Sequence, residues 1–272
     1  LTLDELKFLY EINSKIEEFG YEKDPRIDEI KSKRNIKKDY ALIFDVKEEE
    51  VALSQEEWEE NPNKFKVLVS YLYLRHLVKP NGLVLPHHIN GSLSLSNLTS
   101  AEGLVLPQSV GGYLDIRNLT SAEGLVLPQS VGGDLHLWSL TSAEGLVLPQ
   151  DFSGNLYLSN LTSAEDLVLP QSVGGNLDLR SLDSAVGLVL PQSVGGNLFL
   201  DNLTSAEGLV LPQNVGGNLD LWYLTSAEGL ILPYGFDLDK LECSSYIKNE
   251  ILQNPDKYFR KPPSEEENIS IH

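Results

Sequence analysis

Leucine recurs along the middle of the chain in a pattern that repeats every 21 residues. Each copy opens with a Leu-x-Leu or closely related triplet, and a typical copy, residues 177–197, reads LDLRSLDSAVGLVLPQSVGGN. A fixed period of about 20 to 29 residues with recurring leucine is typical of stacked arrays, in which each unit packs only on its neighbours. The eight copies start, without an insertion, at Leu72, Leu93, Leu114, Leu135, Leu156, Leu177, Leu198 and Leu219.

The place of a residue within the copy predicts which way its side chain points. The two leucines of Leu-x-Leu alternate with a variable residue, as in a short strand with one buried side. The leucine three residues later (Leu98), the alanine after it (Ala101), both leucines of GLVLP and the valine before the glycine pair are also expected to point inward. Because proline cannot donate to a ladder, GLVLP is expected to be an extended back segment. The glycine pair, such as Gly111 and Gly112, is expected to return the chain sharply to the next strand.

The segments on either side of the repeats have a different pattern. Residues 1–66 are expected to form a helical N-terminal cap, since Thr2 and Glu5 match a capping box and apolar residues then follow at helical spacing. A separate interaction or signalling domain is the alternative for this segment. Residues 240–260 are expected to form a C-terminal cap with a helix from Ser244 to Gln253, and residues 261–272 a disordered tail. The predicted fold class is therefore an α+β repeat protein: a parallel-sheet solenoid of eight 21-residue repeats over residues 67–239, capped by helices at both ends.

The LxLxxL pattern with an LP-containing return resembles the short bacterial leucine-rich repeats. The resemblance implies a curved right-handed coil, a parallel sheet on its concave face and a binding role, but it names no ligand. Two features depart from the family. Leucines such as Leu98 replace the usual inward asparagine, so no asparagine ladder is expected, and the apolar residue before the strand lies four instead of three positions ahead of it. These departures leave a straighter β-solenoid as an alternative.

Variation among the copies is concentrated between the two strand leucines and in the residues just after them. By strand alternation, these side chains share one outward face of the sheet. Tyrosine, tryptophan and arginine dominate binding hot spots, whereas drift at exposed sites would favour lysine and glutamate, which never occur here. The residues predicted to form a ligand-binding face are Tyr73, Arg75, Asp115, Arg117, His136, Trp138, Tyr157, Asp178, Arg180, Phe199, Asp201, Asp220 and Trp222.

Charge excludes several classes of partner. The chain carries 40 acidic and 21 basic side chains, a net charge of −19. Between Arg75 and Lys240 the only lysines and arginines are Lys79, Arg117 and Arg180. Because nucleic-acid binding depends on cations that neutralise phosphates, no nucleic-acid partner is expected, and an anionic membrane surface is disfavoured for the same reason. No apolar run is long enough to span a bilayer, so no membrane insertion is expected.

No residue pattern in the chain indicates catalysis. Glutamate recurs in the turn, as at Glu102 and Glu123, but it is interpreted as a solvated row without a metal, because the calcium-binding repeat pattern is missing. Cys243 is the only cysteine and has no activating neighbour in sequence. A single cysteine and the lack of a visible secretory signal slightly favour the cytoplasm. No cofactor is expected.

The sequence thus predicts a non-enzymatic module that binds a protein or peptide on the variable face of the sheet. The alternative is a structural or adhesive spacer with no specific ligand on that face. The partner's identity and the oligomeric state are left open.

Overall fold

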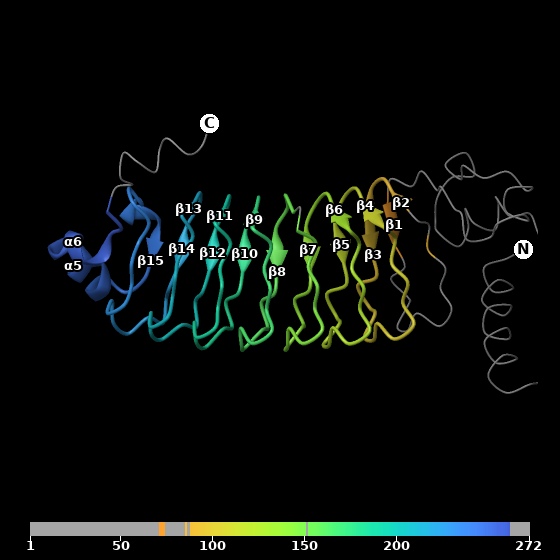
Figure 1. Ribbon diagram of the computed structural model, residues 1–272, viewed down its shortest axis with the longest axis horizontal. Coiled ribbons are helices and arrows are strands. Elements are labelled where there is room, and N and C mark those ends of the chain that lie inside the picture. Colours follow the sequence, from red (N-terminus) through yellow and green to blue (C-terminus); the bar gives the residue numbers. More distant parts are fainter. Residues whose placement is uncertain (1–70, 74–84, 86–87, 151, 262–272) are drawn as a thin grey trace, which may run out of the picture.

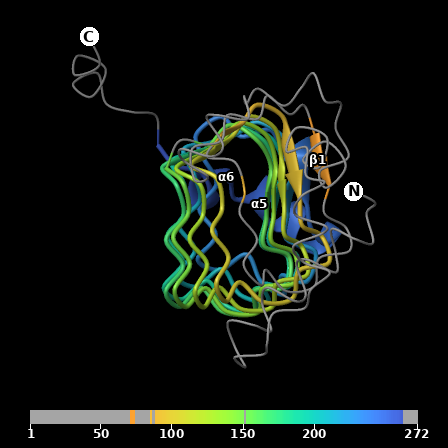
Figure 2. The same cartoon turned by 90° about the vertical axis from the view of Figure 1, so that its right-hand side faces the viewer.

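The computed structural model describes residues 71–73, 85, 88–150 and 152–261. In this part of the chain the backbone winds into a parallel β-solenoid of about seven turns with a spacing of about 21 residues. The turns stack along a straight axis (Figure 1), and they largely superimpose in the view along that axis (Figure 2). The predicted parallel-sheet solenoid is confirmed. Its straight course matches the alternative of a straighter stack and differs from the curved coil that the family resemblance implied.

Several predictions concern residues outside the described part. They include the helical segment 1–66 and the tail beyond Lys261. The first of the eight copies also lies mostly outside it, which is why fewer turns than copies are observed.

The strand at the start of each copy pairs in parallel with its equivalents one turn before and one turn after. Leu177 is in register with Leu156 on one side and Leu198 on the other. The Leu177 N–H donates to the carbonyl of Asn197 at 2.9 Å, so the backbone groups of successive turns satisfy one another. This nine-stranded sheet consists of β1 (Tyr71–Tyr73), β3 (Ser92–Ser94), β5 (Leu114–Asp115), β7 (Leu135–His136), β8 (Leu156–Tyr157), β10 (Leu177–Asp178), β12 (Leu198–Phe199), β14 (Leu219–Asp220) and β15 (Leu241–Glu242).

The opposite side of the coil carries a second set of short strands. They were not predicted, because the sequence indicated only a glycine return there. Phe152 takes the place that valine holds in the other turns and makes a single bridge to Val131, which divides this side into two three-stranded sheets. The strands are β2 (His88–Ile89), β4 (Ser109–Val110), β6 (Ser130–Val131), β9 (Ser172–Val173), β11 (Ser193–Val194) and β13 (Asn214–Val215).

The core lies between the two sides and has the predicted residues in it. In the copy that starts at Leu177, the side chains of Leu177, Leu179 and Leu182 are fully buried, and Ala185 and Val194 are almost so. One prediction needs correction: the second leucine of GLVLP is only partly buried in four copies, at Leu106, Leu127, Leu169 and Leu190. The chain is extended at this edge of the coil, and the valine before each of these leucines points to solvent.

A tight turn after the alanine is built the same way in every described copy. The Ser121 hydroxyl accepts a hydrogen bond from the Glu123 N–H at 3.1 Å, and the Leu125 N–H donates to the Ala122 carbonyl at 2.9 Å. The third residue of this four-residue turn, Gly124, has a φ of 72°, a conformation that glycine adopts without strain. The recurring serine and glycine of this turn therefore have a conformational role.

An asparagine ladder is present, contrary to the expectation drawn from Leu98. It lies at the residue just before the strand and not after it. The side-chain Oδ1 of Asn155 accepts from the Asn176 N–H at 2.6 Å, and Asn176 and Asn197 repeat the contact one turn on, to Asn197 and Asn218, at 2.6 and 2.7 Å. The ladder starts at Asp134, whose carboxylate accepts from the Asn155 N–H at 2.8 Å. Each asparagine thus satisfies a backbone donor of the following turn.

Two short helices lie at the C-terminal end of the stack. Helix α5 (Ser245–Gln253) begins after Ser244, whose hydroxyl accepts from the Ile247 N–H, and it buries Ile247 and Ile251. Helix α6 (Pro255–Tyr258) follows, after which the Leu232 N–H donates to the Tyr258 carbonyl at 2.7 Å. A single turn of 3-10 helix, η2 (Leu238–Lys240), precedes β15. In Figure 1, α5 and α6 lie beyond the last turns. None of the described helices is long and apolar enough to cross a membrane.

Candidate functional site

The outward side of the nine-stranded sheet is here called the variable face. It consists of the second and fourth residues of each copy, counted from its first leucine. Residues at the fourth position are the more exposed, with Trp138 at 37% and Trp222 at 54%. Those at the second position are more buried than predicted, and Asp115, Asp178 and Asp220 are at most 8% exposed. Of the predicted face, the Tyr73 side chain and Arg75 lie outside the described residues.

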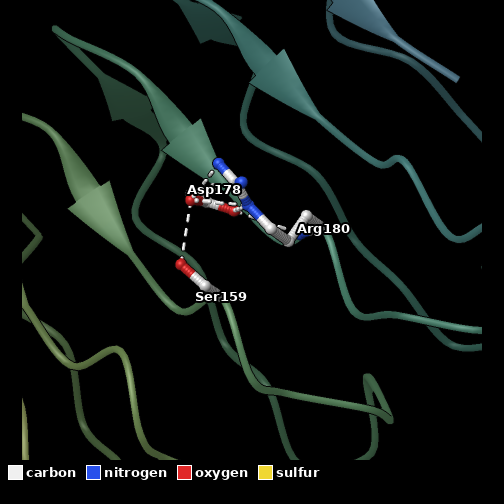
Figure 3. A network of polar contacts seen from close by, with 3 residues as sticks. All are labelled: Ser159, Asp178 and Arg180. Atoms are coloured by element: carbon white, nitrogen blue, oxygen red, sulfur yellow. Dashed lines mark hydrogen bonds and ion pairs between the residues drawn. The ribbon is translucent and has the colours of Figure 1, made fainter. Parts of the chain in front are cut away.

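Two arginines of the variable face are paired with the aspartates two residues before them in the same copy. The Arg180 Nε–H and Nη2–H donate to both carboxylate oxygens of Asp178, and the Nη2–Oδ2 distance is 2.8 Å. Figure 3 shows this pair, together with the Ser159 hydroxyl, which reaches Asp178 from the preceding turn at 2.8 Å. Arg117 and Asp115 form the same pair, at 2.7 Å. The hydrogen bonds to the aspartates raise the pKa of both arginines, and both aspartates are buried.

Each paired guanidinium also lies over an aromatic ring of the next turn. The Arg117 Cζ is 4.6 Å from the centre of the Trp138 ring, and the Arg180 Cζ is 5.2 Å from that of Phe199. A cation over an aromatic face within about 6 Å is attracted by the ring electrons. Asp, Arg and a ring from the next turn therefore form a repeated unit on this face.

Four rings meet in the N-terminal half of the variable face. His136 stacks on Tyr157, with 4.9 Å between ring centres, and makes edge contacts with Trp138 at 5.4 Å and Tyr113 at 5.9 Å. Trp138 and Tyr157, predicted as a neighbouring pair, are 5.6 Å apart. We refer to Tyr113, His136, Trp138 and Tyr157 as the aromatic cluster. Burial lowers the pKa of His136, which favours a neutral ring, and its buried Nδ1 has no hydrogen-bond partner in the described structure.

Tyr113 was not among the predicted site residues. It stands directly before the strand, where later copies have the ladder asparagine, and this departure from the repeat was the available signal. A polar hollow of about 460 Å³ adjoins the cluster. Its lining consists of Ser94, Ser96, Asn97, Tyr113, Asp115, Arg117 and Asn118.

The C-terminal half of the variable face is acidic. Asp201 and Asp220 each have one carboxylate oxygen that is shielded from solvent and without a hydrogen-bond partner in the described structure. Burial, the charge of Asp201 and that of Glu242 raise the pKa of Asp220 to about 6. Burial also raises the pKa of Asp201. We refer to Asp201, Asp220, Trp222 and Glu242 as the acidic end.

The second predicted aromatic pair, Phe199 and Trp222, is arranged differently from the first. Phe199 lies under the Arg180 guanidinium, and no ring contact joins it to Trp222 in the described structure. The two halves of the face therefore differ in kind. One half is aromatic, and the other has separate rings among carboxylates.

Outside the variable face, the chain has an exposed apolar row that sequence analysis did not single out. It consists of the middle residue of GLVLP in each turn, and its valines are 65% to 75% exposed. The row comprises Val105, Val126, Val147, Val168, Val189 and Val210, with Ile231 at its end.

The other candidate groups offer little chemistry. The turn glutamates are exposed, as predicted, and no group of three or more potential metal ligands occurs among the described residues. Burial raises the pKa of the Cys243 thiol, the opposite of activation.

No protein family, curated protein or solved structure matches the chain. The observed fold, a parallel-sheet solenoid with turns of about 21 residues, is compatible with a leucine-rich-repeat-like architecture.

Proposed function

We propose that the chain is a non-enzymatic protein- or peptide-binding module of the short leucine-rich-repeat type, and that the variable face is its binding surface. The observation that carries this proposal is the aromatic cluster. Tyrosine and tryptophan bury much area with few rotatable bonds, and they are enriched in the energetic centres of interfaces.

The cluster is also held in place before any partner arrives. Trp138 lies between the Arg117 guanidinium and the Tyr157 ring, and His136 stacks on Tyr157. Side chains that are already ordered lose less entropy on binding. Trp138 nevertheless keeps 37% of its surface exposed, so a partner could still cover part of it. Adjacent strands are about 4.8 Å apart, so the face spans several tens of ångströms and suits a polypeptide better than a small metabolite.

The test compares the parent chain with a variant that carries Trp138→Ser and Trp222→Ser. Partners are first captured with the parent chain, and their dissociation constants are then measured for both proteins. Each tryptophan should contribute about 2 kcal/mol or more to binding if it is a hot spot. Val147→Ser, which removes an exposed apolar side chain from the valine row, is the matched control and should not weaken binding. If every captured partner binds the double variant as tightly as the parent, the proposal is wrong.

The alternative function, a structural or adhesive spacer, draws on the exposed valine row. An apolar row along the whole stack could associate with a surface or with neighbouring molecules. A triple variant in which Val126, Val147 and Val168 are each replaced by lysine should abolish such association and leave binding at the variable face unchanged. If the double tryptophan variant binds its partners like the parent, and the valine variant no longer associates with surfaces or neighbouring molecules, the chain is better described as a spacer.

A further inference from the structure

Two turns of the stack show how this sheet holds a guanidinium group. At Asp115 and Asp178 the aspartate stands second in the copy, and the arginine stands fourth, on the same side of the strand. The fork of N–H donors reaches both carboxylate oxygens, and the ring of the next turn lies beneath the cation. A buried aspartate on this sheet is thus compatible with a planar cation placed over it.

The turn of Asp220 has the aspartate without the arginine. Its copy reads Leu-Asp-Leu-Trp where the copy at Asp178 reads Leu-Asp-Leu-Arg. Asp220 is buried all the same, at 8% exposure, and its shielded Oδ1 has no partner in the described structure. Trp222 stands in the arginine's place, and an indole offers one N–H where a guanidinium offers a fork.

The neighbours of Asp220 do not replace the missing cation. The next turn contributes Glu242, a second carboxylate, through the pairing of β14 with β15. The preceding turn contributes Asp201, whose shielded Oδ2 is also unpartnered. The charge of Arg180 acts on Asp220, but the Arg180 guanidinium is already hydrogen-bonded to Asp178. Carboxylates withdrawn from water without a counter-ion are unfavourable, so the acidic end is a site that a cation would complete.

We propose that the acidic end binds the guanidinium group of an arginine side chain in a partner polypeptide, an inference that rests on the proposed binding function of the variable face. Arginine fits better than lysine for two reasons. Its planar fork matches carboxylate oxygens in the way that Arg117 and Arg180 do within the chain. It also stacks on aromatic faces, and Trp222 keeps 54% of its surface exposed.

The distance between the two halves of the variable face predicts the spacing of the two contact residues in a partner peptide. Trp138 and Trp222 hold the same position four turns apart, which at about 4.8 Å per strand is roughly 19 Å. An extended peptide that rises about 3.3 Å per residue covers this distance in roughly six residues. The partner segment should therefore carry an apolar anchor for the aromatic cluster and an arginine about six residues away.

The probe is a seven-residue peptide with tryptophan at one end and arginine at the other, separated by glycine and serine, with both termini blocked. Matched peptides carry citrulline or lysine in place of the arginine. Binding to the full chain is measured by titration, with the indole N–H signal of Trp222 as the local readout. The arginine peptide should bind at least tenfold more tightly than the citrulline peptide and severalfold more tightly than the lysine peptide.

Three variants test whether the acidic end causes this preference. Asp220→Asn should reduce the arginine–citrulline difference to less than threefold. Trp222→Arg, which restores the Leu-Asp-Leu-Arg sequence of the copy at Leu177, should do the same by supplying an internal guanidinium. Asp183→Asn, which removes one negative charge from an exposed turn residue outside the face, should keep the full difference.

The outcomes separate this inference from the function on which it rests. Equal affinities for the arginine and citrulline peptides, or an arginine preference that persists in both Asp220→Asn and Trp222→Arg, would overturn the guanidinium site. If the peptides still lose affinity with Trp138→Ser in that case, the variable face remains a binding surface. If none of the peptides binds, and the captured partners bind both tryptophan variants as tightly as the parent, the guanidinium site and the binding function of the variable face are both wrong.

Discussion

The Asp178 carboxylate accepts hydrogen bonds from the Arg180 side chain at both of its oxygens, with 2.8 Å between Arg180 Nη2 and Asp178 Oδ2. Asp178 ends β10 and Arg180 follows it by two residues, and the two side chains meet on the outward side of the sheet. Because Asp178 is buried, Arg180 has a structural role as the partner of this carboxylate, and it also forms part of the exposed face. Asp115 and Arg117 have the same relationship. The arginines of the variable face therefore neutralise the sheet's own aspartates, while 38% of the Arg117 side chain and 49% of the Arg180 side chain stay exposed.

Removing the arginine should destabilise the solenoid. Arg180→Gln leaves the Asp178 carboxylate buried with the Ser159 hydroxyl and the Arg180 backbone N–H as donors. An acceptor deprived of its partner costs about 1–3 kcal/mol, and we expect a loss of this size in urea unfolding at pH 7. Adding Asp178→Asn should recover part of the loss, because the unpaired charge is then gone. A loss below about 0.5 kcal/mol for the single variant would mean that the pair is only a surface contact.

Asp220 should make the stability of the fold depend on pH. Its pKa in the folded chain is about 6, above the usual 3.8, so the folded state binds the proton more tightly than the unfolded state. The residue therefore destabilises the fold increasingly as the pH rises from about 4 to about 6, by up to about 3 kcal/mol, and the effect is constant above that range. Burial is the main cause of the raised pKa, the charges of Asp201 and Glu242 add to it, and that of Arg180 opposes it.

The measurement is the free energy of unfolding of Asp220→Asn relative to the parent, at pH 4 and at pH 8. The asparagine variant should be the more stable protein at pH 8, and its advantage should shrink at pH 4. The other carboxylates of this acidic chain titrate in both proteins, so the difference isolates Asp220. An advantage of equal size at both pH values would show that the carboxylate is not desolvated in solution.

The period of the sequence was enough to predict the register and most of the core. Insertion-free copies can pair only with their equivalents, and Leu177 is indeed in register with Leu156 and Leu198. A leucine that recurs at one place in every copy has a single environment, and this explains why the inward positions were predicted correctly. The second leucine of GLVLP was an exception: in four copies it is only partly buried, because it lies at the edge of the core.

The contacts between turns could not be predicted in the same way. Whether an asparagine side chain reaches the backbone of the next turn depends on distances of a few tenths of an ångström, as at Asn176. The partner of Arg180 could have been any of several nearby aspartates. Tyr113 joins the aromatic cluster from the position between the glycine pair and the strand, to which the repeat pattern assigned no role. Repetition predicts which residues are neighbours, but side-chain geometry decides which of them bind one another.

In one turn an aspartate stands where the other copies have glycine, and replacing it should increase the stability of the chain. Asp166 has a φ of 60° where Gly145 and Gly187, one turn away on either side, have 75° and 80°. It is the only described residue other than glycine with a positive φ. A side chain is strained in this left-handed conformation, although aspartate tolerates it better than most.

Asp166→Gly should therefore stabilise the chain by about 0.5–1 kcal/mol, after the greater freedom of glycine in the unfolded state is taken into account. The readout is the midpoint of urea unfolding. Asp183→Gly is the matched control, because Asp183 is an exposed aspartate without a positive φ, and it should lower stability by about as much. Loss of stability in both variants would contradict the strain at Asp166.

The asparagine ladder allows a test that separates a hydrogen-bond acceptor from a packed side chain. Asn176 accepts from the Asn197 N–H at 2.6 Å, so Asn176→Ala leaves that partly buried donor without an acceptor. A cost of about 1–2 kcal/mol is expected. Asn176→Asp keeps an oxygen in the same place, as Asp134 does for the Asn155 N–H at 2.8 Å, and should cost less than about 0.5 kcal/mol.

Hydrogen exchange at the Asn197 amide gives the local readout for the same pair of variants. Its exchange should become faster in Asn176→Ala and stay close to the parent rate in Asn176→Asp, because only the alanine variant removes the acceptor. The Leu198 N–H, which donates to the Asn218 carbonyl at 2.8 Å, serves as an internal reference, since neither substitution touches that bond. If both variants accelerate exchange at Asn197 equally, the ladder acts through the shape of the asparagine side chain and not through its oxygen.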